Sequence, residues 1–177
     1  SFGFAFDPLP ALRRGQLDLV VSSDLVEVEG IAFVPLFDFK MQLAVSLTHP
    51  FVEKGYVEPQ DLFGEVLITY PVERERLDIY RGFLDPAQVT PKESRTAEMT
   101  IMMIQLVTSG CGVASLPSWA LHEYLERNKV AAIDLGESGY WGTLYAAIRE
   151  EDVSTAYIQS FIEIARETTL RDLKGVR

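Results

Sequence analysis

Polar side chains stand where apolar runs of the sequence end. Ser22 and Ser23 follow the run LDLVV, and Tyr70 follows VLIT, with Arg74 four residues further along. An arginine can pair bidentately with a carboxylate, and the free N–H groups at the start of a helix attract anions. If the apolar runs are strands followed by helices, these side chains would suit a small anionic ligand.

A third polar group precedes the apolar run at 97–109. We expect Thr96, Ala97 and Glu98 to open a helix there, with N–H groups that point outward. Glu98 or Asp7 would be able to pair with an ammonium group. Taken together, the three groups would suit a small zwitterion such as an amino acid.

The same residues also have a purely structural interpretation. Glu98 would then cap its own helix, and Arg74 would pair along a helix with Asp78 at the i,i+4 spacing. Taken one residue at a time, this structural interpretation is favoured. The residues alone therefore leave both interpretations open.

The sequence lacks the residue patterns of common catalytic and metal sites. His49 and His122 have no Cys, His or carboxylate at a metal-ligand spacing, and Cys111 has no neighbouring base that would activate it. No strand is followed by a G-x-S-x-G, Walker or G-x-G-x-x-G motif. The acidic residues 150–152 read as a solvated connection. We therefore expect no enzyme, no catalytic residue, no metal and no cofactor.

The composition describes an acidic globular protein of 177 residues with a net charge of −10 and one cysteine. A chain that binds DNA directly needs a basic surface, and here the basic residues are scattered among acids. One cysteine cannot form an internal disulfide, and the chain opens without a basic, signal-like segment. No apolar run approaches the length of a membrane helix. These features predict a cytoplasmic protein without direct contact to nucleic acid or membrane.

Apolar runs typical of buried strands alternate with runs typical of helices. We expect strands at 17–23, 30–39 continuing into 41–47, 66–70, 89–95, 112–117, 130–135 and 141–149. We expect helices at 8–15, 74–84, 97–109, 118–128 and 154–170. The strand at 17–23 should be buried on both faces and the helix at 97–109 at the centre of a lobe. The order indicates an α/β fold with a mainly parallel sheet, which binds ligands beyond the carboxyl ends of its strands.

Several blocks of the sequence resemble one family of regulators. FDPLPALRRGQLDLVVSSD (6–24), PLFDFKMQLAVSLTHP (35–50) and SGCGVASLPSWAL (109–121) resemble the effector-binding domain of LysR-type transcriptional regulators. LITYPVERERLDIYRGFLDPAQVTP (67–91) is similar to a block of the branch of that family that regulates methionine biosynthesis. The similarity runs over nearly all of residues 3–170.

The resemblance implies an α/β fold of two Rossmann-like lobes, as in type 2 periplasmic binding proteins. Crossover strands at 39–46 and 142–149 would join lobe I (1–39 plus 143–177) to lobe II (40–142). The chain would begin near the end of the second strand of lobe I, which would leave that lobe incomplete at its N-terminus. The effector of such a domain binds in the cleft between the lobes.

By position, the resemblance also implies which residues line the cleft. They are strand-end and helix-start residues of both lobes: Phe6, Asp7, Ser22, Ser23, Tyr70, Arg74, Thr96, Ala97, Glu98, Leu116 and Pro117.

The function implied is that of a ligand-sensing domain in a regulator of methionine biosynthesis. Homocysteine or a related small amino acid would be the co-effector, and the regulator would be a homo-oligomer, a dimer or tetramer. It would contact promoter DNA only through an N-terminal winged helix-turn-helix, which this chain lacks. The alternatives are a sensor of the same fold for a different small anionic effector and a solute-binding receptor. An enzyme that uses the same two-lobe cleft is the least favoured, because no acid/base pair or nucleophile is visible.

Overall fold

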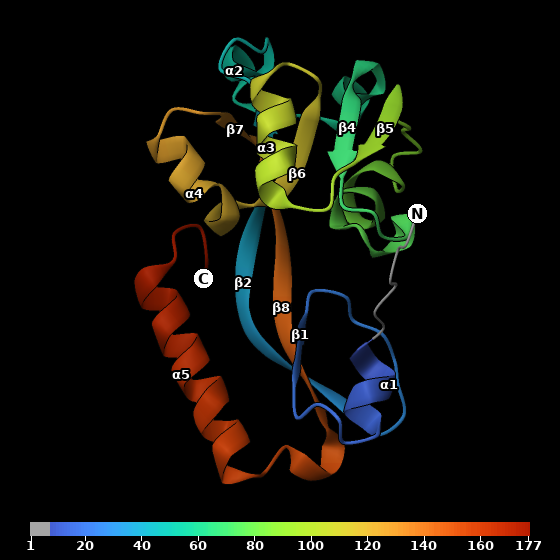
Figure 1. Ribbon diagram of the computed structural model, residues 1–177. Helices are drawn as coiled ribbons and strands as arrows, with labels where there is room; N and C mark the ends of the chain where they lie inside the picture. Colours follow the sequence, from blue (N-terminus) through green and yellow to red (C-terminus); the bar gives the residue numbers. More distant parts are fainter. Residues whose placement is uncertain (1–7) are drawn as a thin grey trace. The chain divides into compact units, whose positions relative to one another are not determined.

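The computed structural model describes residues 8–177. They form two compact units: unit 1 comprises 8–39 and 142–177, and unit 2 comprises 40–141. The chain passes between the units within two long strands, β2 (Ile31–Val45) and β8 (Tyr140–Arg149). These two strands are neighbours in the sheet (Figure 1). Each unit is described below by itself.

Unit 1 is built on β8, which is buried on both of its faces. β1 (Val20–Ser22) pairs antiparallel with β8, with Val21 opposite Ala146. Because successive strand residues point to opposite faces, Ala147 packs with Leu12 of α1 (Pro8–Arg13) on one face. On the other face Ile148 packs with Ile158 of α5 (Ala156–Asp172). Two small cores thus lie on the two sides of one strand.

Arg149, at the end of β8, ties the N-terminal part of unit 1 to this strand. Its guanidinium donates to the carbonyl oxygens of Leu12 (2.9 Å) and Leu17 (2.7 Å), at the end of α1 and in the turn after it. It also donates to the carboxylate of Asp152 (2.5 Å), in the short 3-10 helix η4 (Glu150–Asp152). The carbonyl of Leu12 also accepts the N–H of Gly15 (3.0 Å), so Arg149 adds a second bond there and links the end of α1 and the segment after it to β8.

The sheet of unit 2 is mixed. β4 (Val66–Thr69) runs parallel to β5 (Glu93–Thr96) and β6 (Val113–Pro117). β6 pairs antiparallel with β2, which pairs antiparallel with β7 (Ala131–Leu135). β7 in turn runs parallel to the short strand β3 (Tyr56–Val57).

Two helices, α3 (Thr100–Thr108) and α4 (Ser118–Glu126), belong to one core cluster of unit 2. The inward side chains of these helices pack against strand residues that project from one face of the sheet. The buried members are Ala44, Ile68, Ala97, Met103, Ile104, Val107, Ala114, Leu116, Leu121 and Val130. The remaining short elements are α2 (Phe51–Lys54) and the 3-10 helix η1 (Pro59–Gly64). Figure 1 shows α3 in front of β6, with α4 to the left of α3.

The α/β class and the order of the main elements agree with the sequence-based prediction, but four details were wrong. The sheet is not mainly parallel, because β1–β8, β2–β6 and β2–β7 are antiparallel. Antiparallel pairing follows from the long crossover strands, which run against their neighbours. β1 is not buried on both faces either. It is the edge strand of the sheet, and Val21 is 47% exposed.

The predicted helix at 74–84 is the third difference. The segment forms a 3-10 turn, η2 (Arg74–Arg76), and then a π-helix, η3 (Ile79–Leu84). Leu77 between them is extended (φ −89°, ψ 117°), which interrupts the helix. Gly82 lies against the Tyr140 ring, where a Cβ atom would come within 2.4 Å of the ring carbon Cζ. The wide π-turn and the small residue together admit this ring.

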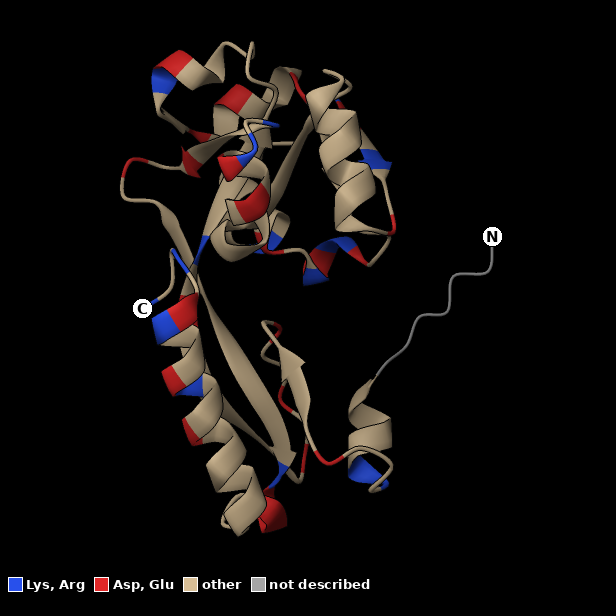
Figure 2. Cartoon of the chain, turned by 60° about the vertical axis from the view of Figure 1, so that its left-hand side comes forward, with Lys and Arg blue, Asp and Glu red and all other residues tan. Residues whose placement is uncertain are grey.

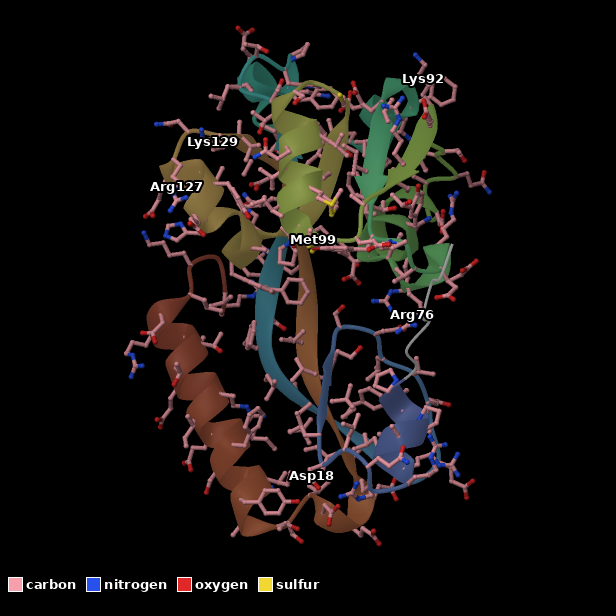
Figure 3. All side chains as sticks on the ribbon, viewed as in Figure 1. Asp18, Arg76, Lys92, Met99, Arg127 and Lys129 are labelled. Carbon is pink, nitrogen blue, oxygen red and sulfur yellow. The ribbon has the colours of Figure 1, made fainter. Side chains whose placement is uncertain are left out.

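The fourth difference concerns α3, which is not buried at the centre of unit 2. Met103, Ile104 and Val107 point inward, but Ile101 and Met102 are 51% and 48% exposed. Met99, just before the helix, is also exposed and is labelled at that end of α3 in Figure 3. Apolar residues on both faces of a helix therefore do not mean that both faces are covered.

Acidic and basic residues are interspersed in both units (Figure 2). Over residues 8–177, no helix has the length and apolar character needed to cross a membrane.

Candidate functional site

The ends of β4 and β5 bring several predicted site residues together in unit 2. Thr69 lies opposite Thr96 in the parallel pair, and the N–H of Ala97 donates to the carbonyl of Thr69 (2.9 Å). The next residue, Tyr70, is hydrogen-bonded through its hydroxyl to that of Thr100 (2.7 Å), the first residue of α3. The strand ends and the start of α3 are thereby fixed to one another.

The residues Thr96 to Glu98 do not open α3. Thr96 closes β5, and the helix begins at Thr100, after an extended N-cap residue, Met99. The N–H of Ala97 is already bonded and its side chain is buried. Glu98 is exposed, and α3 has no side-chain cap, so the capping interpretation is also wrong. The prediction failed because TAEMT contains two threonines, Thr96 and Thr100, and threonine suits a helix start at either position.

Arg74 is held by two neighbours in unit 2. Its Nε donates to Oδ1 of Asp85 (3.2 Å), a second nitrogen makes an ion pair with the same oxygen, and the guanidinium lies 4.1 Å above the Tyr80 ring. The hydrogen bond with Asp85 raises the pKa of Arg74 above its usual value. The predicted i,i+4 pair with Asp78 does not form, because Asp78 pairs with Arg81 (2.5 Å). Arg74 also lies in a 3-10 turn and not in the first turn of an α-helix.

Leu116 and Pro117 end β6. The Leu116 side chain is apolar and packs fully buried in the core cluster that α3 and α4 share, so it serves the core and offers a ligand no polar group. Pro117 is partly exposed and is followed directly by α4. Any contact that this segment makes with a ligand therefore falls to Pro117.

The predicted residues of unit 1 are arranged differently. The Ser22 hydroxyl accepts a hydrogen bond from the N–H of Asp24 (3.0 Å), which closes a local turn after β1. Ser23 next to it is partly exposed. Phe6 and Asp7 lie outside the described residues.

Two residues that the sequence analysis did not name stand at the same sheet end as Tyr70 and Thr96. Thr69 is 7% exposed. The hydroxyl oxygen of Ser115 in β6 is buried and has no hydrogen-bond partner among residues 8–177. The sequence feature that could have identified them is a hydroxyl residue late in an apolar strand, as Thr69 in VLIT and Ser115 in VASLP.

The histidines have structural surroundings. Nδ1 of His49 accepts the N–H of Phe51 (3.3 Å), and its Nε2 lies 3.5 Å from Glu65. His122 lies 3.2 Å from Glu126 on the same helix face. In the described part of the chain, no three His, Cys, Asp or Glu side chains are grouped so that they could hold a metal ion.

A family model for the LysR substrate binding domain matches residues 2–170. The chain belongs to this family, and its mixed α/β fold with a non-closed sheet is that of LysR effector-binding domains, which are similar to type 2 periplasmic binding proteins. The residue blocks that resembled the family in the sequence are thereby confirmed.

MetR proteins are among the relatives of this chain. The HTH-type transcriptional regulator MetR of Salmonella typhimurium is 39% identical over 99% of this chain and 55% of its own length. MetR of Escherichia coli K12 is 40% identical over the same shares of both chains. The regulatory domain of MetR from N. meningitidis superimposes with a TM-score of 0.88 at 39% identity, covering 99% of this chain and 81% of that one. The chain spans about half the length of the curated relatives it matches.

Proposed function

We propose that the chain is the ligand-sensing domain of a LysR-family transcriptional regulator of methionine biosynthesis, with homocysteine or a related small amino acid as its effector. The observation that supports this most strongly is the similarity to MetR, which extends over 99% of the chain and not over isolated motifs. The relatives are regulators and not enzymes, which agrees with the lack of a catalytic constellation in the sequence.

The strand ends of unit 2 offer chemistry that fits a sulfur amino acid. Tyr70 and Thr96 supply hydroxyl groups, and Met99, which is 54% exposed, supplies a polarisable thioether beside them in the sequence. Such a ligand has one apolar, sulfur-containing end and one zwitterionic end. The proposed contacts are therefore Tyr70, Thr96, the backbone of Ala97 and Glu98, and Pro117.

Arg74 remains a proposed contact for the effector, with one condition. Its guanidinium already pairs with Asp85, so a ligand would have to share or replace that partner. The side chain is 42% exposed, which leaves it accessible for such an exchange. Ser22 and Ser23 of unit 1 stay in the proposed set by sequence position.

The further parts of the proposal concern the whole regulator. With a net charge of −10, this chain is poorly suited to bind DNA itself, so promoter binding is assigned to an N-terminal winged helix-turn-helix. LysR regulators act as oligomers, and we assign a homodimer or homotetramer in the cytoplasm to this one. Effector binding would then alter how the subunits meet promoter DNA.

Isothermal titration calorimetry of the 177-residue chain, under reducing conditions, tests the effector. L-homocysteine, L-methionine and L-cysteine are titrated separately, with D-homocysteine as the matched control for stereospecific recognition. Saturable heat with at least one L-amino acid is expected. No heat with any of the three, or binding only of an unrelated small anion, would overturn the proposal.

A further inference from the structure

Three hydroxyl residues lie in one row across the sheet of unit 2. Thr96 of β5 is paired with Thr69 of β4. On the other side of β4, Ile68 is paired with Ala114, and this parallel register continued by one residue places Thr69 opposite Ser115 of β6. Partners in adjacent strands project from the same face of a sheet. Thr96, Thr69 and Ser115 therefore form a hydroxyl row across three parallel strands. Thr96 and Thr69 are the last residues of β5 and β4, and Ser115 is the middle residue of β6.

The hydroxyl row is on the face of the sheet that α3 and α4 do not cover. Ile68 and Ala114, the preceding residues, belong to the core cluster under these helices, and side chains alternate between the faces. On the face of the row, Ser94 of β5, two residues before Thr96, is hydrogen-bonded to the hydroxyl of Tyr80 (2.6 Å). The Tyr80 ring in turn carries the guanidinium of Arg74. The guanidinium of Arg74 therefore lies on the same side of the sheet as the hydroxyl row.

Ser115 is the member of the row whose hydrogen-bonding needs are unmet. Its hydroxyl oxygen is buried without a partner within residues 8–177. Two hydroxyl pairs of unit 2 are bonded, by contrast: Tyr80 with Ser94 (2.6 Å) and Tyr70 with Thr100 (2.7 Å). An unpaired buried hydroxyl destabilises a fold, and this one lies in the middle of β6, level with Thr69 at the end of β4.

We propose that the hydroxyl row Thr96–Thr69–Ser115 receives the carboxylate of the effector. This inference rests on the function proposed above and extends it to named donors. Neighbouring strands are about 4.8 Å apart, so two adjacent hydroxyls can donate to one carboxylate placed between them. A carboxylate only accepts, which satisfies the unused O–H of Ser115, whereas an ammonium group would leave that proton without an acceptor.

The test separates the carboxylate from the rest of the ligand. L-homocysteine is compared with 3-aminopropane-1-thiol, which lacks the carboxylate, and with 4-sulfanylbutanoate, which lacks the amine. Each is titrated calorimetrically into the unaltered chain, Ser115→Ala and Thr69→Val. Ser94→Ala is the matched control. It removes a hydroxyl on the same face of the sheet, two residues before Thr96 on β5, and that hydroxyl is already bonded to Tyr80.

The unaltered chain should bind both carboxylates at least about tenfold more tightly than 3-aminopropane-1-thiol, the range expected for a charge-assisted hydrogen bond. Ser115→Ala and Thr69→Val should lose most of that preference, and Ser94→Ala should keep it. Thermal unfolding by circular dichroism checks that the variants fold. Ser115→Ala should melt no lower than the unaltered chain, so it carries the test even if Thr69→Val does not fold.

The possible failures differ from one another. If the unaltered chain binds none of the three compounds, both this inference and the homocysteine proposal fall. If it binds L-homocysteine while Ser115→Ala keeps the full preference for a carboxylate, the effector proposal stands and the hydroxyl row is rejected as the carboxylate site.

Discussion

Ser22 in unit 1 and Ser115 in unit 2 are both small hydroxyl residues near the end of a strand, but their surroundings differ. The Ser22 hydroxyl accepts the N–H of Asp24 (3.0 Å) and so forms part of a turn. The Ser115 hydroxyl is buried, and no described residue bonds to it. One hydroxyl contributes to local structure, and the other makes no hydrogen bond that would offset the cost of its burial. Residue type and position alone do not separate these two roles, but hydrogen bonding does.

The largest effect is expected for a neighbour of Ser115 that points to the opposite face. Leu116→Ala removes a fully buried side chain from the core under α3 and α4. We expect the free energy of unfolding to fall by about 3–4 kcal/mol, measured by urea denaturation. A loss below about 1 kcal/mol would mean that Leu116 is not a packing residue, and would reopen it as a ligand contact.

The hydrogen bond between Tyr70 and Thr100 gives the second effect. Tyr70→Phe removes the hydroxyl and keeps the ring, which should cost about 1 kcal/mol of unfolding free energy. Thr100→Val should cost a similar amount, and the double variant little more, because both changes remove the same bond. Additive losses in this cycle would show that the two hydroxyls act independently.

Two variants test the comparison between the serines, because they should change the free energy of unfolding in opposite directions. Ser22→Ala should lower the free energy of unfolding by about 0.5–1 kcal/mol, because Asp24 loses its acceptor. Ser115→Ala should leave it unchanged or raise it by up to about 1 kcal/mol, because an unpaired buried hydroxyl is removed. A clear loss of stability in Ser115→Ala would contradict our distinction between the two strand ends.

The smallest effect is expected for the Arg74–Asp85 pair. Both side chains are about 40% exposed (42% and 40%), and such ion pairs contribute little in water. Arg74→Ala should cost less than about 1 kcal/mol, and the cost should shrink further in high salt. Asp85→Asn is the matched control, because it removes the carboxylate and leaves Arg74 stacked on Tyr80. A large, salt-independent loss in Arg74→Ala would make the arginine structural and remove it from the proposed ligand contacts.

The spacing of apolar residues predicted some of the positions of a regular helix that are buried. Ile158 and Ile162 fall on one face of α5 and are buried there, as the apolar spacing predicts. Tyr157 and Phe161, which the same spacing placed inward, are 55% and 45% exposed. Residues 74–84 could not be predicted in the same way, because the π-turn depends on Gly82 accommodating Tyr140, a residue far away in the sequence. The outward face of α3 is apolar, and the pattern did not show that Ile101 and Met102 stay exposed.

The candidate site shows the same limit. Tyr70 was predicted because it follows the run VLIT, and Thr96 because it precedes the apolar run at 97–109, although it proved to end a strand and not to open a helix. Thr69 and Ser115 were missed because their significance comes from the register between β4 and β6, which joins residues more than forty positions apart. The absent hydrogen bond of Ser115 is visible only when all of its neighbours are in place. Homocysteine was proposed as the effector from the family resemblance, because the side chains at the strand ends also suit other small anions.

An NMR titration with L-homocysteine tests the central claim most directly, that the hydroxyl row of unit 2 contacts the effector. In ¹H–¹⁵N spectra of the 177-residue chain, the amides of Thr69, Thr96 and Ser115 should shift in a saturable way. The amide of Thr108, whose hydroxyl is bonded to the carbonyl of Ile104 within α3, should stay in place. Saturable shifts elsewhere that spare all three row residues, or no shifts at all, would contradict the account.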